Sequence, residues 1–164
     1  MFIRKILHQN FNRMEYDVKH LSKQTDIMYL DGKYNGYLHC GVMSLCTYKV
    51  LKEYNIESKV YKTSRGNYKN REDHIHLRIG DIIIDPTYKQ FLRIKGNTVF
   101  NTILHDYYDP IFIGYEEELF DRYNNLICIN NYISNYKLDI KDFDVFWNKN
   151  EDVTEYYNLE LLNK

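Results

Sequence analysis

The residue best placed for chemistry is Cys40, which opens a stretch with helical periodicity. Unpaired backbone N–H groups and the positive end of the helix dipole both favour a thiolate at a helix N-terminus. The thiolate is the nucleophilic form of cysteine, so this position suits nucleophilic catalysis. The alternative is that Cys40 is a small buried hydrophobe, which is where free cysteine usually lies.

Two short apolar runs farther along the chain predict a β-hairpin. The runs, 74–79 and 82–85, are joined by the dipeptide Gly80-Asp81, which is a signal for a two-residue turn. Such a turn pairs Ile79 with Ile82. Because side chains alternate between the faces of a strand, this register decides which residues of the two runs meet.

Three side chains with catalytic potential share one face of this hairpin: His74, His76 and Asp85. His76 is expected directly opposite Asp85, while His74 lies on the diagonal, at roughly 7–8 Å between backbones. A carboxylate beside an imidazole fixes its tautomer and supports its protonated form. Together with Cys40, these residues supply the nucleophile, base and orienting group of a cysteine hydrolase. The alternative is an exposed polar face on an edge hairpin.

A zinc site is a further alternative for the same residues. His39, Cys40, His74 and His76 offer four nitrogen and sulfur donors, which is enough for zinc. Adjacent side chains at a helix start point in different directions, so His39 and Cys40 are awkward ligands for one ion. The chain also contains no C-x-x-C pair. The spacing therefore argues against a metal site, and no cofactor is expected.

The elements that must position these residues follow from hydrophobic spacing and turn residues. The order of helix, helix and strands predicts an α+β fold, with helices packed on one face of an antiparallel sheet. A single domain over 1–164 is expected, with a core at about 10–115 and a helical C-terminal extension at about 116–164. The expected elements are helices at 10–23, 40–54, 116–135 and beyond 140, strands at 56–61 and 110–114, and a polar lid loop at 64–73.

Composition and charge exclude several classes of function. The chain has 164 residues, with 22 Lys+Arg against 23 Asp+Glu, so it lacks the basic excess of a dedicated nucleic-acid binder. No apolar run approaches the roughly 18 residues of a membrane helix, and the N-terminus does not resemble a signal peptide. The 17 Tyr and abundant Asn, Ile and Lys indicate an A/T-rich genome, viral or microbial.

The cysteines point to a reducing compartment. There are three, Cys40, Cys46 and Cys128, which is an odd number without the density of a disulfide framework. Cys46 and Cys128 lie in apolar surroundings and are expected in the core. A cytoplasmic protein without nucleic-acid or membrane partners is therefore predicted.

The two catalytic segments resemble one known group of enzymes. The segment 38–41 and the helix after it resemble the nucleophile helix of the transglutaminase-like, papain-related cysteine hydrolase superfamily. The segment 73–87 is similar to that superfamily's hairpin, which reads H-x-W-x-E-V, a turn, an apolar run and D-P-T. The resemblance covers about residues 36–91, with a looser likeness at 110–119. The order Cys, His, Asp is that of transglutaminases, peptide N-glycanases and arylamine N-acetyltransferases.

This resemblance implies a papain/transglutaminase-like core and a role for each residue. It makes Cys40 the nucleophile, His74 the general base and Asp85 the orienting carboxylate, with His76 as the alternate base. His76 stands where the family often has Trp, and Arg78 where it often has Glu. The implied activity acts on amide or peptide bonds of a protein or peptide through an acyl-enzyme. The competing hypotheses are a catalytically inactive papain-like binding or structural protein, and the zinc protein described above.

Overall fold

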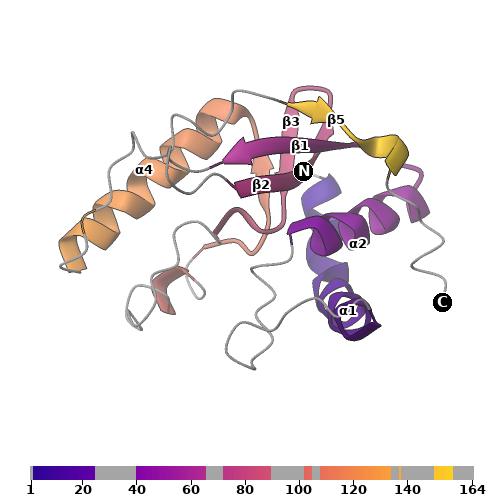
Figure 1. Cartoon of the computed structure of the whole chain (residues 1–164). Coiled ribbons are helices and arrows are strands. Elements are labelled where there is room, and N and C mark those ends of the chain that lie inside the picture. Colours follow the sequence, from indigo (N-terminus) through magenta and orange to yellow (C-terminus); the bar gives the residue numbers. More distant parts are fainter. Residues whose placement is uncertain are drawn as a thin grey trace.

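The fold is α+β, with N-terminal helices, a five-stranded antiparallel sheet and a C-terminal helix (Figure 1). The computed structural model describes residues 2–24, 40–65, 72–89, 102–104, 108–133, 137 and 150–156. The sheet has the strand order β4-β3-β2-β1-β5. No helix in these ranges is long and apolar enough to cross a membrane. The elements are α1 (Phe2–Gln24), α2 (Cys40–Glu53), β1 (Lys59–Arg65), β2 (Glu72–Ile79), β3 (Ile82–Asp85), β4 (Phe112–Gly114), α4 (Glu116–Ile133), β5 (Glu151–Asp152) and the 3₁₀ turn η5 (Thr154–Tyr156).

Helix α1 begins at Phe2, eight residues before the predicted start at Asn10. Asn10 lies inside the helix, where its side-chain amide donates a hydrogen bond to the Ile6 carbonyl at 2.9 Å. Buried residues at helical spacing occur both before and after Asn10. The fully or nearly fully buried residues of α1 are Ile6, Leu7, Met14, Val18 and Leu21. The face that they form packs against α2, so α1 is an integral part of the hydrophobic core.

Helix α2 ends at the stop signal that the sequence predicts. Asn55 has a φ of 56°, in the left-handed region. The Asn55 N–H donates to the Lys52 carbonyl at 3.0 Å, and the Ile56 N–H donates to the Leu51 carbonyl at 2.9 Å. These two bonds form a Schellman motif, in which carbonyls at the helix end find donors. Ile56 also packs against the core that contains Leu51, which fixes the direction in which the chain leaves α2.

Replacing Asn55 tests this helix end. Asn55→Ala is expected to lower the free energy of unfolding by about 1 kcal/mol, because alanine pays the left-handed steric cost that asparagine tolerates better. Asn55→Gly is expected to be neutral or slightly stabilising, because glycine adopts positive φ without that cost. Urea denaturation of both variants measures the difference. Equal stabilities for Ala and Gly would contradict the left-handed assignment.

The β2–β3 hairpin has the predicted register. Ile79 pairs with Ile82 across the turn. Gly80 has a φ of 57°, and Asp81 does not have positive φ. Positive φ at the first central position alone is typical of a type II′ turn, whose twist matches that of the flanking strands. The turn dipeptide therefore sets which residues face each other on the face of the hairpin that carries His76 and Asp85.

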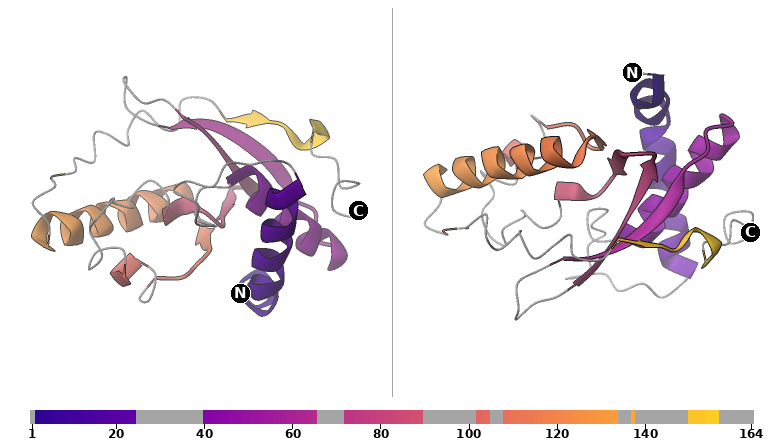
Figure 2. Two further views of the ribbon diagram at one scale, coloured as in Figure 1. Left: turned by 60° about the horizontal axis from the view of Figure 1, so that its bottom comes forward. Right: turned by 90° about the horizontal axis from the view of Figure 1, so that it is seen from above.

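The helices cover both faces of the sheet, whereas the prediction placed them on one. Leu77 and Ile84, which are partners on β2 and β3, belong to the core formed with α1 and α2. Ile83 points to the opposite face and belongs to a second core with Phe112 and α4. Figure 2 shows α4 on one side of the strands and α1 with α2 on the other.

Three further predictions need correction. The strand expected at 56–61 is β1, at Lys59–Arg65, so β1 and β2 take both ends of the expected lid loop; its middle, 66–71, lies outside the described residues. Cys128 is exposed and not in the core. It lies beside the buried stripe of α4, which consists of Leu119, Tyr123, Leu126, Ile127 and Asn130.

The described part of the C-terminal segment contributes an edge strand to the sheet. A short helix was expected beyond residue 140; the described part contains the strand β5 and the short 3₁₀ helix η5. β5 pairs with β1 at Tyr61 and Lys62. Hydrogen bonds of 2.9 Å join the Val153 N–H to the Val60 carbonyl and the Val60 N–H to Thr154 Oγ1. The expected helix otherwise falls on 138–149, outside the described residues.

Candidate active site

The structure brings His74 and Asp85 into direct contact. His74 Nε2 and Asp85 Oδ2 are 2.7 Å apart, and both side chains are fully buried. The hairpin register places His76 across from Asp85, yet the residue that contacts Asp85 is His74, on the diagonal. The right-handed twist between strands can bring a diagonal pair together.

The second carboxylate oxygen of Asp85 is also bound. Asp85 Oδ1 accepts a hydrogen bond from the Thr87 N–H at 3.0 Å and one from Thr87 Oγ1 at 3.4 Å. The two contacts hold the carboxylate plane while Oδ2 faces His74. A buried carboxylate with both oxygens engaged is well suited to orient an imidazole and to balance its positive charge.

His76 has different partners from His74. Its ring is stacked with those of His74 and Tyr61, at a centroid distance of 6.1 Å from each and with interplanar angles of 15° and 21°. Tyr61 is the cross-strand partner of His76 on β1. Arg78 Nε donates to His76 Nε2 at 3.3 Å, and the Arg78 guanidinium carbon lies 5.6 Å from the centre of the Tyr61 ring. His76 is fully buried inside this stack.

Cys40 is the first residue of α2, and the packing of α2 places it at the His74 end of the sheet. α2 and β2 each run opposite to β1, so both begin at the same end (Figure 1). The Ser44 hydroxyl donates to the Ile75 carbonyl at 3.0 Å, which fixes how the two elements lie along each other. Cys40 precedes Ser44 by one helical turn, about 6 Å, and His74 precedes Ile75 by about 3.3 Å. Along their common direction, Cys40 is therefore level with the first residues of β2. Alternation along β2 puts His74, with Asp85, on the face of the sheet opposite to Leu77 and Ile84, against which α2 packs.

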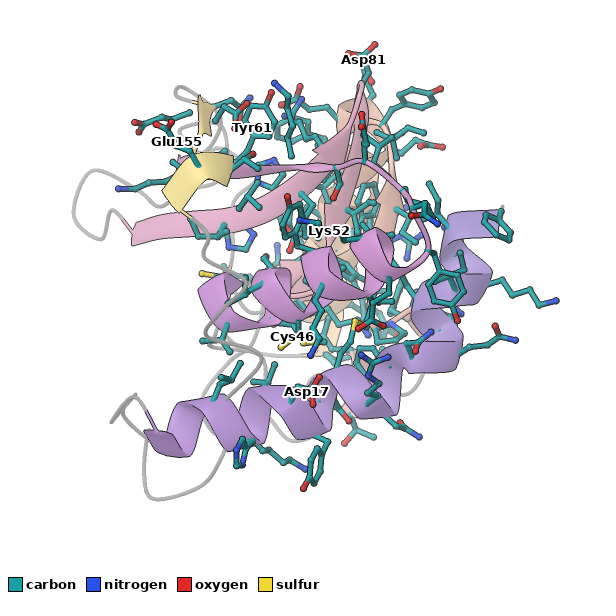
Figure 3. All side chains as sticks on the ribbon, turned by 90° about the vertical axis from the view of Figure 1, so that its right-hand side faces the viewer. Asp17, Cys46, Lys52, Tyr61, Asp81 and Glu155 are labelled. Carbon is teal, nitrogen blue, oxygen red and sulfur yellow. The ribbon has the colours of Figure 1, made fainter. Side chains whose placement is uncertain are left out.

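The three cysteines differ sharply in environment. Cys40 is half-buried at the helix start, Cys46 is buried and Cys128 is exposed. Figure 3 shows Cys46 on the side of α2 that faces α1. Burial raises the pKa of the Cys46 thiol to about 12, so Cys46 is a neutral thiol at physiological pH. Cys46 thus has the core role predicted for it and is unsuited to nucleophilic chemistry.

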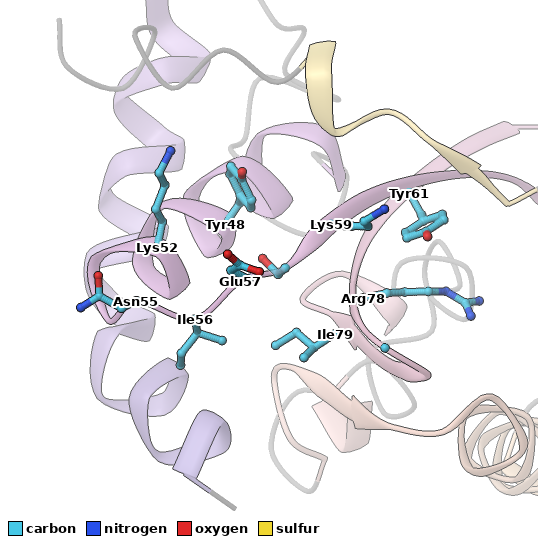
Figure 4. A pocket seen from close by; sticks show the side chains of 11 residues that line it. Tyr48, Lys52, Asn55, Ile56, Glu57, Lys59, Tyr61, Arg78 and Ile79 are labelled. Atoms are coloured by element: carbon cyan, nitrogen blue, oxygen red, sulfur yellow. The ribbon is translucent and has the colours of Figure 1, made fainter.

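A separate pocket lies at the far end of α2. It has a volume of about 790 Å³ and lies between the end of α2, the start of β1 and the β2–β3 turn (Figure 4). Its lining includes Tyr48, Lys52, Tyr61 and Arg78. Tyr48 lies two helical turns beyond Cys40, so this pocket is not the space in front of the proposed nucleophile. It shares two lining residues, Tyr61 and Arg78, with the surroundings of His76.

The metal alternative gains no additional support from the described residues. Among them, no group of three or more His, Cys, Asp or Glu side chains is arranged to hold a metal ion. His39, a donor in that hypothesis, lies outside these residues. His74 and His76 both project from the same face of β2, but their rings stack on each other instead of converging on a point.

Sequence reasoning missed three supporting residues. Thr87 follows the Asp-Pro pair of the motif, and its position two residues after Asp85 was the available signal for a side chain that bonds the carboxylate. Arg78 shares the face of His74 and His76 by alternation, so its place in the stack was also accessible. Tyr61 was not, because its register depends on β1 pairing with β2 across a long polar loop.

The chain matches no protein-family model, no curated protein and no solved structure. What the site does is therefore inferred from its own residues and their geometry.

Proposed function

We propose that this protein is a cysteine-dependent hydrolase or acyltransferase that acts on amide or peptide bonds and is built on a papain/transglutaminase-like core. Cys40 is the nucleophile, His74 the general base and Asp85 the orienting carboxylate. The observation that carries the proposal is the buried 2.7 Å contact between His74 Nε2 and Asp85 Oδ2, at the end of the sheet where α2 begins with Cys40. Nucleophile, base and orienter in this arrangement form the minimum set for covalent acyl transfer.

The geometry assigns the ring nitrogens of His74 to different tasks. Because Nε2 faces Asp85, Nδ1 is the ring nitrogen left to exchange a proton with Cys40. This exchange requires Cys40, which begins a helix on the other face of the sheet, to reach His74 at the end of β2. Transfer of the Cys40 proton to Nδ1 gives a thiolate and an imidazolium. The helix dipole at the start of α2 stabilises the thiolate, and the Asp85 carboxylate stabilises the imidazolium.

The reaction then proceeds in two balanced steps. The Cys40 thiolate attacks the amide carbonyl carbon, and backbone N–H groups near the helix start bind the oxyanion. His74 gives its proton to the leaving nitrogen, the C–N bond breaks and a thioester remains. Water or an amine next attacks the thioester while His74 accepts a proton, so that the C–S bond breaks and an acid or a new amide is released. The mechanism requires no cofactor.

A pool of synthetic peptides that contain every residue type tests this activity. In H₂¹⁸O, a hydrolase adds one ¹⁸O to the new carboxylate. With a fluorescent primary amine in the reaction, an acyltransferase attaches the amine to the peptide. At least one of these products, detected by mass spectrometry, is expected from the parent protein and from Cys128→Ser, and neither is expected from Cys40→Ser.

Two outcomes would count against the proposal. Equal product from the parent and Cys40→Ser would show that Cys40 is not the nucleophile. Absence of product from all three proteins is the result expected of an inactive papain-like binding protein. In that case the alkylation experiment in the Discussion decides whether Cys40 is an activated thiol at all.

A further inference from the structure

Among the described residues, the buried stack on β2 holds two imidazoles, and the carboxylate in contact with it is Asp85, which contacts His74. His74 and His76 lie with ring centres 6.1 Å apart and are both fully buried. Asp85 Oδ2 contacts His74, and Asp85 Oδ1 accepts from Thr87. A second imidazolium beside the first would be a buried charge with a like-charged neighbour, which is strongly unfavourable. The pair can therefore carry one positive charge.

The contact with Arg78 shows which histidine stays neutral. A guanidinium carries only donors and is always charged. Because Arg78 Nε donates to His76 Nε2 at 3.3 Å, this ring nitrogen must be an acceptor without a proton. His76 then carries its proton on Nδ1 and is neutral. A permanent cation at this distance also opposes any further proton on the same ring.

We infer that Arg78 is a positioning residue that holds His76 as a neutral imidazole, so that the single positive charge of the pair stays on His74 beside Asp85. The catalytic meaning of this arrangement rests on the proposed function, in which His74 is the base. His76 then acts as a neutral spacer and not as the alternate base. It packs against His74 and limits the ring orientations that His74 can adopt.

The groups that the described residues of β1, β2, β3 and α4 place around His76 fit this assignment. His74 and Arg78 belong to the same strand, and Tyr61 stacks from β1. From β3, the Asp85 carboxylate is directed to His74. From α4, Glu116 approaches the Arg78 guanidinium, at 3.9 Å, and so helps to balance the arginine and not His76. The described neighbours thus supply His76 with a cation and aromatic rings.

The protonation state of His76 can be read directly by NMR. In the parent protein labelled with ¹⁵N-histidine, two-bond ¹H–¹⁵N spectra are expected to show His76 with a protonated Nδ1 and a bare Nε2 from about pH 5 to 8. In Arg78→Met, which keeps the bulk and removes the donor and charge, Nε2 is expected to take a proton. At neutral pH, His76 should then be the neutral tautomer with its proton on Nε2. As the pH falls, it should become the imidazolium. Arg78→Lys keeps the charge and is expected to retain the bare Nε2.

Arg13→Met is the matched control. Arg13 pairs with Glu53 at the end of α2 and does not contact the stack, so His76 should behave as in the parent. A protonated Nε2 in the parent, or a bare Nε2 that persists in Arg78→Met, would overturn the inference. If Arg78→Met does not fold, the parent spectrum and Arg78→Lys still decide. These spectra do not require Cys40 to react, so an inert Cys40 would reject the proposed function and leave the state of His76 a separate result.

Discussion

At about pH 6, alkylation of Cys40 is expected to be on the order of 10-fold slower in His74→Ala than in the parent protein. An ordinary thiol with a pKa of about 8.5 is only about 0.3% thiolate at this pH, whereas a thiol paired with an imidazolium is largely ionised. The gain is smaller than the ratio of thiolate fractions, because a thiolate of low pKa is intrinsically less nucleophilic. The rate against pH, followed by intact mass and peptide mapping, should rise only near about pH 8.5 in the variant.

The other two cysteines are internal controls for this measurement. Cys128 is exposed and reports the reactivity of an accessible thiol in the same sample, while Cys46 is buried, with a pKa raised to about 12, and should remain unlabelled. His76→Ala is expected to slow alkylation less than His74→Ala, because the histidine that contacts Asp85 is His74. If Cys40 and Cys128 share one pH profile, indifferent to His74, then Cys40 is an ordinary thiol and the enzyme proposal fails.

Asp85→Ala is expected to lower the free energy of unfolding by about 3–5 kcal/mol, the usual range when one partner of a buried charge pair is removed. Asp85 is fully buried, and its loss would leave both His74 Nε2 and the Thr87 N–H without their acceptor. Buried donors without acceptors are costly because they have been removed from water. Urea denaturation followed by circular dichroism measures the difference in stability.

Asp121→Ala is the matched control for this substitution. Asp121 is exposed on α4, so its replacement should change stability by less than about 0.5 kcal/mol. Asp85→Asn keeps the shape and one acceptor oxygen and should fold better than Asp85→Ala, which makes it the variant in which to measure Cys40 alkylation. If Asp85→Ala were as stable as Asp121→Ala, the buried dyad would not be part of the folded protein.

Local chemistry alone determined several elements around the site. The helical spacing after Cys40 and the left-handed Asn55 mark both ends of α2, because helix ends depend on a few neighbouring residues. The dipeptide Gly80-Asp81 fixes the β2–β3 register for the same reason, since a two-residue turn leaves no freedom in the pairing. The residue types of the candidate site were accessible because they lie on these elements.

Elements that depend on distant parts of the chain could not be predicted from local sequence patterns. β1 extends to Arg65 through a polar stretch because β2 pairs with it there, and such pairing depends on segments that meet only after folding. β5 is two residues long and is held at the sheet edge by backbone bonds around Val60. Cys128 lies outward because α4 turns its buried stripe toward β3 and β4, which the apolar composition of the helix did not reveal.

The His74–Asp85 pair shows most clearly what the sequence determines and what only the tertiary structure decides. The alternation of His74 and His76 and the turn before Asp85 predicted that two imidazoles and a carboxylate would share one face of the hairpin. Which imidazole would reach the carboxylate was a choice between a directly opposite position and a diagonal one. The tertiary structure gives Asp85 to His74, while Tyr61 and Arg78 bind His76 from its other side. Such a choice depends on strand twist and on contacts from neighbouring strands, and neither is encoded in the spacing of the three residues.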